Sequence, residues 1–374
     1  MRICHITSAH DPEDVRIFYK ECCSLAKHGY DTHLVQMGSS YIKNGVNIHG
    51  FGTMEGSRFK RARITTRKAY QVALEVNADI YHIHDPELLP YALKLKRSGK
   101  VVIFDSHENN VGYLKEKPYW PKIVGYCVSF FYGIYEKYIC KRIDGIIGVT
   151  PDLTDYFSKM NKNTETVSNF PVFIEPNKAP SFNNKKIVFA GLIDEQWNHE
   201  NIIRALEYLP DVKYELCGSG QQEFIEKLKK MPAWDRVEFR GRIPHSEVAN
   251  VLSDCSIGLA LLSPSLNTYG MKGTMGNNKI FEEMMAGLPV ICTNFERWED
   301  FVNRYSCGIC IDPSNPHEIA DAISGVLSNL EKAKEMGENG LEATRVEYNW
   351  STQEQKLIRL YERIAGKISH RVSE

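Results

Sequence analysis

The sequence has almost no excess charge of either sign: 46 lysines and arginines stand against 47 aspartates and glutamates, for a formal net charge of -1. This balance argues against a generally basic nucleic-acid-binding protein, and no nucleic acid partner is expected. The chain also lacks an apolar run of about 18 residues, so no membrane-spanning helix is expected. Its first residues, MRICHITSAH, lack the charged and apolar regions of a signal peptide, which predicts a cytoplasmic protein.

Paired CxxC motifs, the usual signature of a cysteine zinc site, are missing as well. The ten cysteines include a single CGIC at 307–310, between a turn and an apolar residue. Most of the cysteines lie in apolar runs, where we expect small core residues in a reducing environment. The first strand–helix turn, TSAHDPEDVRIF, has no GxGxxG, so a conventional dinucleotide site is not expected there.

Short apolar segments alternate with amphipathic ones along the whole chain. In the first half, the expected strands are RICHIT, DTHLVQM, DIYHIH, KVVIFDSH and GIIGVT, and a helix is expected from Arg16 to Gly29. The second half repeats the theme with KKIVFAG, KYELCGSG, RVEFRGR, SIGLALL, LPVICT and CGICID. Strands that alternate with helices predict parallel sheets covered on both faces.

The predicted fold class is therefore α/β, with two facing, doubly wound Rossmann-like domains. The first domain is predicted at 1–170 and the second at 187–349. Between them, 171–186 has three prolines, several asparagines and no periodicity, which indicates a linker. The helical pattern at about 350–374 is expected to pack back onto the first domain. Ligands of such sheets bind beyond the carboxyl ends of the strands.

The segment GNNKIFEEMMAGLPVI, residues 276–291, places Glu282 and Glu283 in a predicted helix that begins near Asn278. The two side chains point about 100° apart. Free amides and the positive end of the helix favour an anion such as a diphosphate, and a carboxylate can bind the hydroxyls of a ribose. An acid that only complements the helix dipole would give the same pattern, so the residues alone leave both interpretations open.

The run from Lys279 to Glu282, followed by Gly287 and Pro289, resembles the donor-binding segment of family 4 glycosyltransferases of the GT-B fold (glycosyl transferases group 1). HITSAHDPEDVRIFYKECCSLAKHGYDTHLV, HIHDPELLPYALKLK, VVIFDSHE, IVFAGLI, VEFRGRIPHSEV and YNW resemble segments of such enzymes from capsule and O-antigen clusters. The resemblance covers nearly the full length. It implies a retaining hexosyltransferase that moves a sugar from a nucleotide diphosphate, with UDP favoured, to a saccharide or polyprenyl-linked acceptor, without metal or cofactor.

On the family pattern, Glu282 binds the donor ribose, and Glu283 is left as a helix-surface residue. The other predicted donor-binding residues are Gly191, Gly218, Arg242, Ile243, Thr274, Asn277, Asn278 and Lys279. In DSHE, just past a predicted strand, His107 and Glu108 are the predicted catalytic residues, and the resemblance places His107 near the transferred sugar. The leaving phosphate can itself deprotonate the acceptor in this family, so no protein base is required.

The predicted acceptor-side residues are Arg16, His84 and Asp85. Arg16 is expected to meet an acceptor phosphate or to pair with Asp14. The HIHD motif at 82–85 ends a strand, and together with His107 and Glu108 it could be mistaken for a metal site. Because these residues belong to two strand ends and no third spaced histidine accompanies them, we predict no metal and a polar floor of the acceptor site.

Three positions depart from the family pattern. Thr274 replaces the earlier acid of a spaced pair, and Leu192 and Trp197 replace basic residues that usually face the diphosphate. Each lost cation removes a charge-assisted contact of about 1.5–3 kcal/mol, unless Lys272 or Lys279 substitutes. A non-catalytic partner subunit of this fold therefore remains an alternative, as does a sugar-nucleotide epimerase, which can share the two α/β domains.

Two stretches point to a membrane surface. Residues 57–68 hold six lysines and arginines, and residues 113–139 are rich in aromatic side chains. Basic residues gain about 1 kcal/mol each near anionic lipid, and tyrosine and tryptophan favour the membrane interface. These stretches predict peripheral membrane contact, although a solvated basic helix and an aromatic core helix would give the same patterns.

Overall fold

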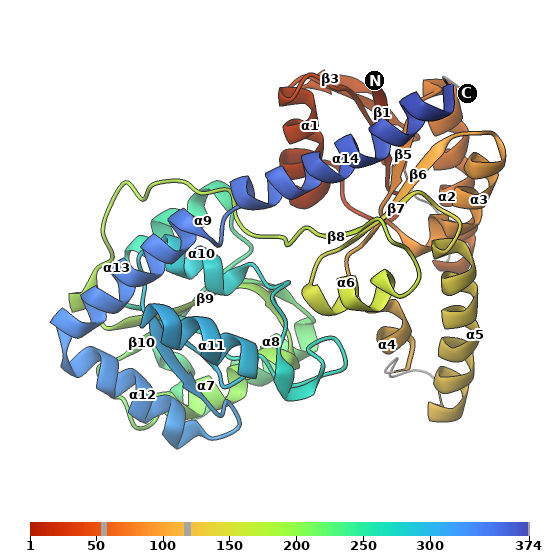
Figure 1. The fold of residues 1–374 in the computed structure, drawn as a ribbon. Helices are drawn as coiled ribbons and strands as arrows, with labels where there is room; N and C mark the ends of the chain where they lie inside the picture. The colour runs from red at the N-terminus through yellow and green to blue at the C-terminus, as the bar shows by residue number, and fades with distance from the viewer. Residues whose placement is uncertain (54–57, 116–120, 373–374) are drawn as a thin grey trace. The chain divides into compact units, whose positions relative to one another are not determined.

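The computed structural model describes residues 1–53, 58–115 and 121–372, with the backbone alone described at 58–62, 245 and 367–372. The chain forms two compact units (Figure 1). Unit 1 comprises Met1–Asn169 together with Trp350–Glu374, and unit 2 comprises Phe170–Asn349. The segment for which a linker was predicted, 171–186, is thus counted with unit 2, and it includes a short 3-10 turn.

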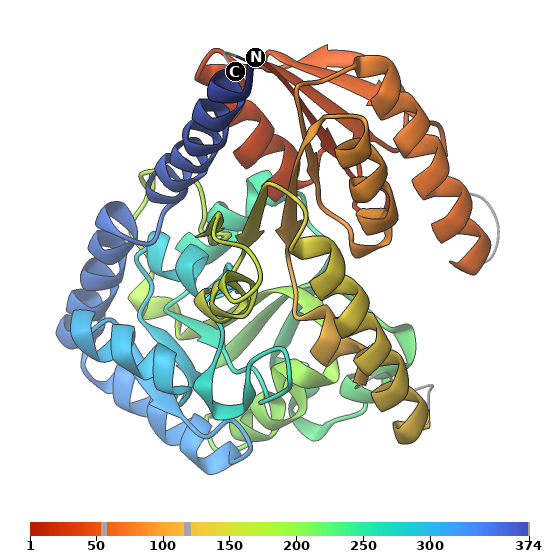
Figure 2. The ribbon, with the colours of Figure 1, turned by 45° about the vertical axis from the view of Figure 1, so that its right-hand side comes forward.

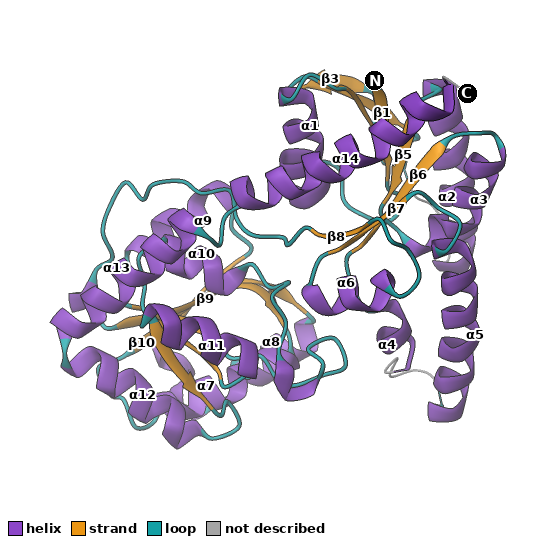
Figure 3. Ribbon diagram, in the orientation of Figure 1, coloured by secondary structure: helices purple, strands orange, loops and turns teal. Residues whose placement is uncertain are grey.

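Unit 1 is built on an eight-stranded sheet in the order β3-β4-β2-β1-β5-β6-β7-β8 (Figure 3). Neighbouring strands are parallel except for the antiparallel pair β3 and β4. The five strands predicted for this half are confirmed, whereas the short strands β3, β4 and β8 were not predicted. The bounds are β1 Arg2–Ile6, β2 Asp31–Gln36, β3 Tyr41–Lys43, β4 Val46–Gly50, β5 Ile80–Ile83, β6 Val101–Ser106, β7 Gly145–Gly148 and β8 Thr164–Thr166.

Helices cover both faces of this sheet. One face packs against α2, α3, α5 and α6, and the other against α1, the preceding π-helix η1 and the C-terminal helix α14. In both ribbon views, α14 runs back over the part of unit 1 that contains the first strand (Figures 1 and 2). The bounds are η1 Val15–Cys22, α1 Cys23–Lys27, α2 Arg58–Val76, η2 Pro86–Leu88, α3 Leu89–Arg97, α4 Asn110–Lys115, α5 Lys122–Cys140, α6 Pro151–Ser158 and α14 Trp350–Val372.

The helix predicted from Arg16 to Gly29 forms, but its first two turns are π-helical. Asp14 caps it, because its carboxylate accepts hydrogen bonds from the backbone N–H groups of Arg16 and Ile17 at 2.8 and 3.0 Å. The wider turn of a π-helix is frequent at functional sites. Here it directs the side chains of Arg16 and Glu21 inward, and both are buried.

Unit 2 is built on a six-stranded parallel sheet in the order β11-β10-β9-β12-β13-β14. All six strands predicted for this half are confirmed. Strand β9 pairs with β10 on one side and with β12 on the other, so the order reverses there, and ligands of doubly wound sheets bind beyond such a point. The strands are β9 Lys186–Ile193, β10 Lys213–Gly220, β11 Val237–Gly241, β12 Ile257–Ala260, β13 Val290–Thr293 and β14 Gly308–Ile311.

The helices of unit 2 connect these strands and pack with them in one large apolar cluster and one smaller cluster. The α-helices are α7 His199–Leu206, α8 Gln222–Leu228, α9 His245–Ser253, α10 Lys279–Met285, α11 Glu296–Tyr305, α12 Pro316–Ser328 and α13 Leu330–Val346. The 3-10 turns are η3 Phe182–Asn184, η4 Glu195–Trp197, η5 Pro232–Arg236 and η6 Gly270–Lys272. Among the helices of the described residues, none is both long and apolar enough to cross a bilayer.

Candidate functional site

Polar side chains replace apolar ones on one buried face of the unit 1 sheet. On β1, Ile3 packs with α14, yet the next residue on the same face is His5. On β5, Ile80 is followed on that face by His82, and on β6, Ile103 is followed by Asp105. His5, His82 and Asp105 are all fully buried. Three polar residues at the carboxyl ends of adjacent strands, under helices, form a polar cluster inside the core.

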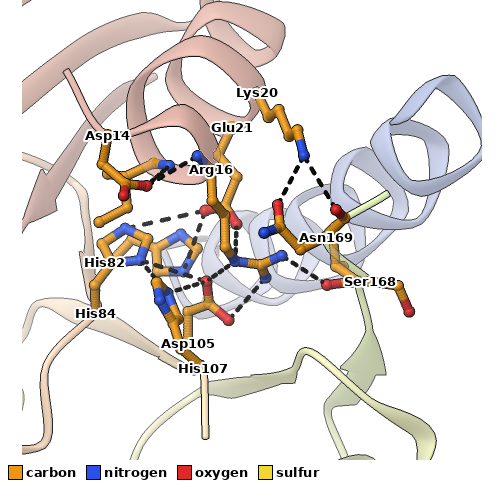
Figure 4. A network of polar contacts seen from close by, with 12 residues as sticks. Asp14, Arg16, Lys20, Glu21, His82, His84, Asp105, His107, Ser168 and Asn169 are labelled. Atoms are coloured by element: carbon orange, nitrogen blue, oxygen red, sulfur yellow. Dashed lines mark hydrogen bonds and ion pairs between the residues drawn. The ribbon is translucent and has the colours of Figure 1, made fainter. Parts of the chain in front are cut away.

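Arg16 supplies the cation of this cluster (Figure 4). Its Nε and Nη2 atoms donate to the two carboxylate oxygens of Asp105 at 2.9 and 3.0 Å, and its Nη1 donates to the Val167 carbonyl at 2.9 Å. Nε also lies 3.1 Å from Glu21 Oε1. The predicted pairing of the Arg16 side chain with Asp14 is wrong, because the buried guanidinium pairs with Asp105 and Glu21 instead. Its contact with an acceptor phosphate stays a prediction.

The cluster reaches the surface through His107. The Nε2 atom of His107 lies 3.0 Å from Asp105 Oδ2 and 3.2 Å from His84 Nδ1, and its side chain is 18% exposed. Glu108, the other predicted catalytic residue, is exposed, and its backbone carbonyl accepts a hydrogen bond from Ser106. Of the two, only His107 is thus joined to the buried cluster by a side-chain contact recorded among the described residues.

The other predicted acceptor-side residues, His84 and Asp85, are each only 2% exposed. The Asp85 carboxylate accepts hydrogen bonds from the hydroxyls of Thr7 and Ser8, both at 3.1 Å, and lies 3.4 Å from the ring of the half-buried His10. Both side chains thus lie beneath the surface, and Asp85 holds the turn after β1 in place. Their role on the acceptor side stays a prediction.

Burial and neighbouring charges shift the pKa values of the acids and histidines in this cluster, and not all in the same direction. Burial raises the pKa of Glu21, and the neighbouring Asp105 raises it further. The pKa of Asp105 lies well below its usual range, because Arg16 and His107 outweigh the cost of burial. Burial lowers the pKa of His84 to about 4, so its imidazole is neutral at physiological pH.

The ends of β9 and β10 approach each other closely in unit 2. Gly191 on β9 pairs in register with Gly218 on β10, and both have positive φ angles, +159° and +144°. A Cβ atom on Gly218 would collide with the Gly191 carbonyl. A Cβ atom on Gly191 would collide with the side-chain end of Lys279. Of these two predicted donor residues, Gly218 thus lets the ends of β9 and β10 approach each other, and Gly191 leaves the space that the end of the Lys279 side chain occupies.

Lys279 lies beside the two positions where the family pattern has basic residues. Its Nζ atom is 4.8 Å from the centre of the Trp197 ring and 5.3 Å from that of Phe189, which is cation–π geometry. Burial lowers the pKa of Lys279, while the nearby acids Glu282 and Glu283 oppose that shift. Leu192 is 58% exposed. Of the two candidates for a substitute cation, Lys279 is therefore the one next to Gly191.

The burial of the two glutamates of α10 is the reverse of the prediction. Glu282 is half-buried, whereas Glu283, predicted to lie on the helix surface, is 2% exposed. Its side chain packs on the backbone of Gly258 in β12, where a Cβ atom would not fit. Burial raises the pKa of Glu283 well above its ordinary value. The prediction failed because α10 packs against the sheet on the Glu283 side.

Side chains of the loop before α10 accept hydrogen bonds from backbone N–H groups of the loop and of the first residue of the helix. The Thr274 hydroxyl accepts a hydrogen bond from Gly276 N at 3.1 Å, and the Asn277 side chain accepts one from Lys279 N at 3.0 Å. Asn278 precedes α10, and its side-chain oxygen is buried without a hydrogen-bond partner among the described residues. Arg242 and Ile243 follow β11 on the same strand edge, exposed and half-exposed respectively. The predicted donor residues thus lie near the ends of β9 and β10 and in the segments that follow β11 and β12, four neighbouring strands of one sheet.

Sequence reasoning missed three members of the unit 1 cluster: His5, Glu21 and Tyr361. His5 is in register with His82 across β1 and β5, but that pairing cannot be read from one isolated histidine in a strand. Glu21 faces inward because η1 is π-helical, which no sequence pattern indicated. Tyr361 reaches the cluster from α14, 356 residues after His5 along the chain. The one signal in the sequence was Glu21 itself, an acid within the amphipathic helix predicted from Arg16 to Gly29.

Three comparisons place this fold and site among known proteins. Residues 173–343 match the model of the family described as glycosyl transferases group 1. The uncharacterized glycosyltransferases MJ1069 and MJ1178 of Methanocaldococcus jannaschii are 23% and 25% identical to the chain over 257 and 236 residues. These matches span 64% and 62% of this chain, and 64% and 63% of the relatives, which is under two thirds of their length.

Solved structures resemble the chain over nearly its full length. Sucrose-phosphate synthase from Thermosynechococcus elongatus is similar with a TM-score of 0.76 and 17% identity, over 98% of this chain and 99% of that one. HepE of Anabaena, in a complex with UDP and glucose, gives 0.72 and 14% identity over 97% and 100%. The predicted fold class is confirmed: the chain has the parallel-sheet, Rossmann-like units of GT-B glycosyltransferases. The match to the glycosyl transferases group 1 model, over residues 173–343, falls within unit 2.

Proposed function

We propose that this chain is a retaining glycosyltransferase that takes a sugar from a UDP-sugar and adds it to a saccharide or polyprenyl-linked acceptor. The bond between the anomeric carbon and the diphosphate breaks, and a bond to the acceptor oxygen forms on the same face. The acceptor proton passes to the departing diphosphate, so no protein base and no metal ion at the diphosphate are needed. The product would belong to a surface polysaccharide of the capsule or O-antigen kind.

The placement of Lys279 and Glu282 is the observation that supports this proposal most. Both belong to α10, which follows the strand next to the point where the sheet order reverses. Lys279 is positioned to meet the diphosphate, as a cation beside Gly191. Glu282, one turn further along α10, is positioned to accept hydrogen bonds from the ribose. The complexes of HepE with UDP and with UDP-glucose support UDP as the nucleotide.

For unit 1, we propose that His107 faces the transferred sugar while Asp105 holds its ring. A carboxylate 3.0 Å from a histidine nitrogen fixes the ring orientation and favours one tautomer. Arg16 holds Asp105 in turn with two hydrogen bonds. Glu108, exposed at the same turn, is the second proposed catalytic residue.

A screen of nucleotide sugars tests the proposed activity. The full chain is incubated with UDP-, GDP- and other nucleotide sugars, with and without saccharide and lipid-linked acceptors. We expect release of UDP that depends on an acceptor, and a product with the anomeric configuration of the donor. Isomerisation of the sugar without an acceptor would indicate an epimerase instead. An absence of nucleotide binding by calorimetry would contradict both enzymes and would favour the non-catalytic partner that Leu192 and Trp197 leave open.

The first variant prediction separates the two glutamates of α10. Glu282→Ala should weaken UDP binding about 10- to 100-fold, because it removes charge-assisted hydrogen bonds of roughly 1.5–3 kcal/mol. Glu283→Gln is the control: it keeps the volume of a buried side chain, and we expect a dissociation constant within about twofold of the unchanged protein. Calorimetric titration with UDP measures both. Equal losses in the two variants would refute the ribose role of Glu282.

The second variant prediction concerns the cation beside Gly191. Lys279→Met keeps most of the apolar stem but removes the charge, and we expect about 10- to 100-fold weaker UDP binding and a smaller dependence on salt. Lys272→Met, in the exposed turn η6, is the matched control and should leave the affinity nearly unchanged. If the Lys272 variant loses affinity and the Lys279 variant does not, the wrong lysine has been assigned to the diphosphate.

We also propose that α5 docks on the inner face of an anionic membrane. Most aromatic residues of this helix do not pack into the core, as one interpretation of the sequence had it: Phe130 and Phe131 are 64% and 68% exposed, and the neighbouring Ile123 is 78% exposed. The other large exposed apolar side chains of α5 are Val124, Tyr126, Ile134, Tyr135 and Tyr138. A contiguous apolar helix face of this size is typical of an interaction site. Among the other predicted membrane residues, 57 and 116–120 are outside the described residues, as are the side chains at 58–62.

Vesicle sedimentation measures this docking. The full chain should sediment with vesicles of phosphatidylglycerol and phosphatidylcholine, and a double variant, Phe130→Ser with Phe131→Ser, should bind at least about tenfold more weakly, because each phenylalanine contributes roughly 1.5–3 kcal/mol when buried. The control, Ile42→Ser, removes an exposed apolar residue from β3 and should bind as the unchanged chain does. Failure of the unchanged chain to sediment, or equal binding by the double variant, would contradict membrane docking.

A further inference from the structure

Three histidines and one glutamate converge at the centre of the polar cluster of unit 1. They are His5 on β1, Glu21 on η1, His82 on β5 and His84 just after β5. Each offers one ligand atom, and these four atoms all lie within 4.8 Å of one another. Residues 82 and 84 alone did not suggest this set, because the third histidine comes from another strand and the carboxylate from a helix.

The spacing of the four atoms matches a small tetrahedral cation. Glu21 Oε2 is 3.8 Å from His5 Nδ1, and 4.0 Å from the Nε2 atoms of His82 and His84. His5 Nδ1 is 2.9 Å from His84 Nε2. Four ligands bound to Zn²⁺ at about 2.0–2.2 Å stand about 3.3–3.6 Å apart, which lies between these values. Binding would therefore draw Glu21 closer to the histidines and move His5 and His84 slightly apart.

The outward nitrogen of each histidine already has an oxygen partner. His82 Nδ1 and His5 Nε2 lie 2.7 and 3.2 Å from the Tyr361 hydroxyl, which has two lone pairs and can accept from both. His84 Nδ1 lies 3.4 Å from the Asp105 carboxylate. Metal-bound histidines regularly donate their other N–H to a carboxylate or another oxygen acceptor, which fixes the ring and directs its bare nitrogen to the ion.

Two of the four inward atoms lack a hydrogen-bond partner among the described residues: Glu21 Oε2 and His82 Nε2, both buried. The other two, His5 Nδ1 and His84 Nε2, are within hydrogen-bond distance of each other. The second oxygen of Glu21 also lacks such a partner, although it is ion-paired with Arg16. A buried carboxylate is costly without compensation, and a bound cation would hold Glu21 in its ionised form.

We propose that unit 1 binds one Zn²⁺ ion through His5 Nδ1, His82 Nε2, His84 Nε2 and Glu21 Oε2. Three imidazole nitrogens and one carboxylate oxygen suit Zn²⁺ among the common divalent ions, and a fully buried set of four protein ligands is typical of a structural site. The ion ties β1, β5 and η1 together and orients His84 towards Asp105. It is a site separate from the donor diphosphate, and it does not depend on the proposed transfer.

Metal analysis of the purified full chain tests this site. After expression with added zinc and gel filtration, we expect about one zinc per chain by mass spectrometry of the elements. His82→Ala should lose the metal. The control, His33→Ala, changes a histidine of the neighbouring strand β2 whose ring pairs with His49 at 2.8 Å outside the set, and it should keep the metal.

A variant that keeps all four ligands guards against loss by misfolding. Tyr361→Phe removes the oxygen that accepts from two of the histidines, and we expect about 10- to 100-fold weaker zinc binding in competition with a chelator. Cobalt offers a second readout, because Co²⁺ added to the metal-free chain should give the strong visible absorption of a tetrahedral ion, and His82→Ala should not.

Two results would overturn the proposal. One is an unchanged chain that contains no zinc after growth with zinc, and that shows neither a tetrahedral Co²⁺ spectrum nor any effect of chelator on its melting temperature. The other is zinc retained at one per chain by His82→Ala and by Glu21→Gln, which would place the metal elsewhere. Neither result would affect the nucleotide screen, so failure of this site and failure of the proposed transfer are distinguishable.

Discussion

The approach of α10 to the end of β9 is the contact on which the proposed donor site depends. It exists because Gly191 has no Cβ atom, so the Lys279 side chain can occupy that space. Gly218 permits the same closeness between the β9 and β10 backbones. On the other side of α10, Glu283 packs on Gly258 and leaves Glu282 on the half-exposed side. Close contacts at Gly191 and Gly258 therefore accompany the packing of the short helix whose two charged residues we assign to the nucleotide.

In unit 1 the polar side chains also gather at the carboxyl ends of neighbouring strands, but they are mainly histidines and acids. The carboxyl ends of β1, β5 and β6 are neighbours in the sheet, so residues far apart in the sequence meet there. The chain has placed histidines and an aspartate at these ends, on the face covered by η1 and α14, where an ordinary sheet would be apolar. Buried polar groups are stable only when they are paired, and Arg16, Tyr361 and the proposed zinc ion supply partners. His107 is the point where this interior network reaches solvent.

The periodicity of the sequence predicted most of the fold. Eleven strands were predicted and found, because β-strands of parallel sheets form compact apolar runs between amphipathic helices. The short strands β3, β4 and β8 were missed, because segments of three to five residues with polar members give no clear period. The burial of Glu283 was missed for a different reason: the sequence gives the 100° angle between adjacent side chains, but tertiary packing decides which of them faces the sheet.

Hydrogen exchange of the full chain with and without UDP tests the assignment of the donor site to unit 2 most directly. The account predicts slower exchange on UDP binding in the peptides around 188–197 and 274–285, where the end of β9 meets α10. Peptides of β1, β5 and β6 should exchange at the same rate with and without the nucleotide. Protection confined to unit 1, or nucleotide binding without protection around α10, would contradict the account.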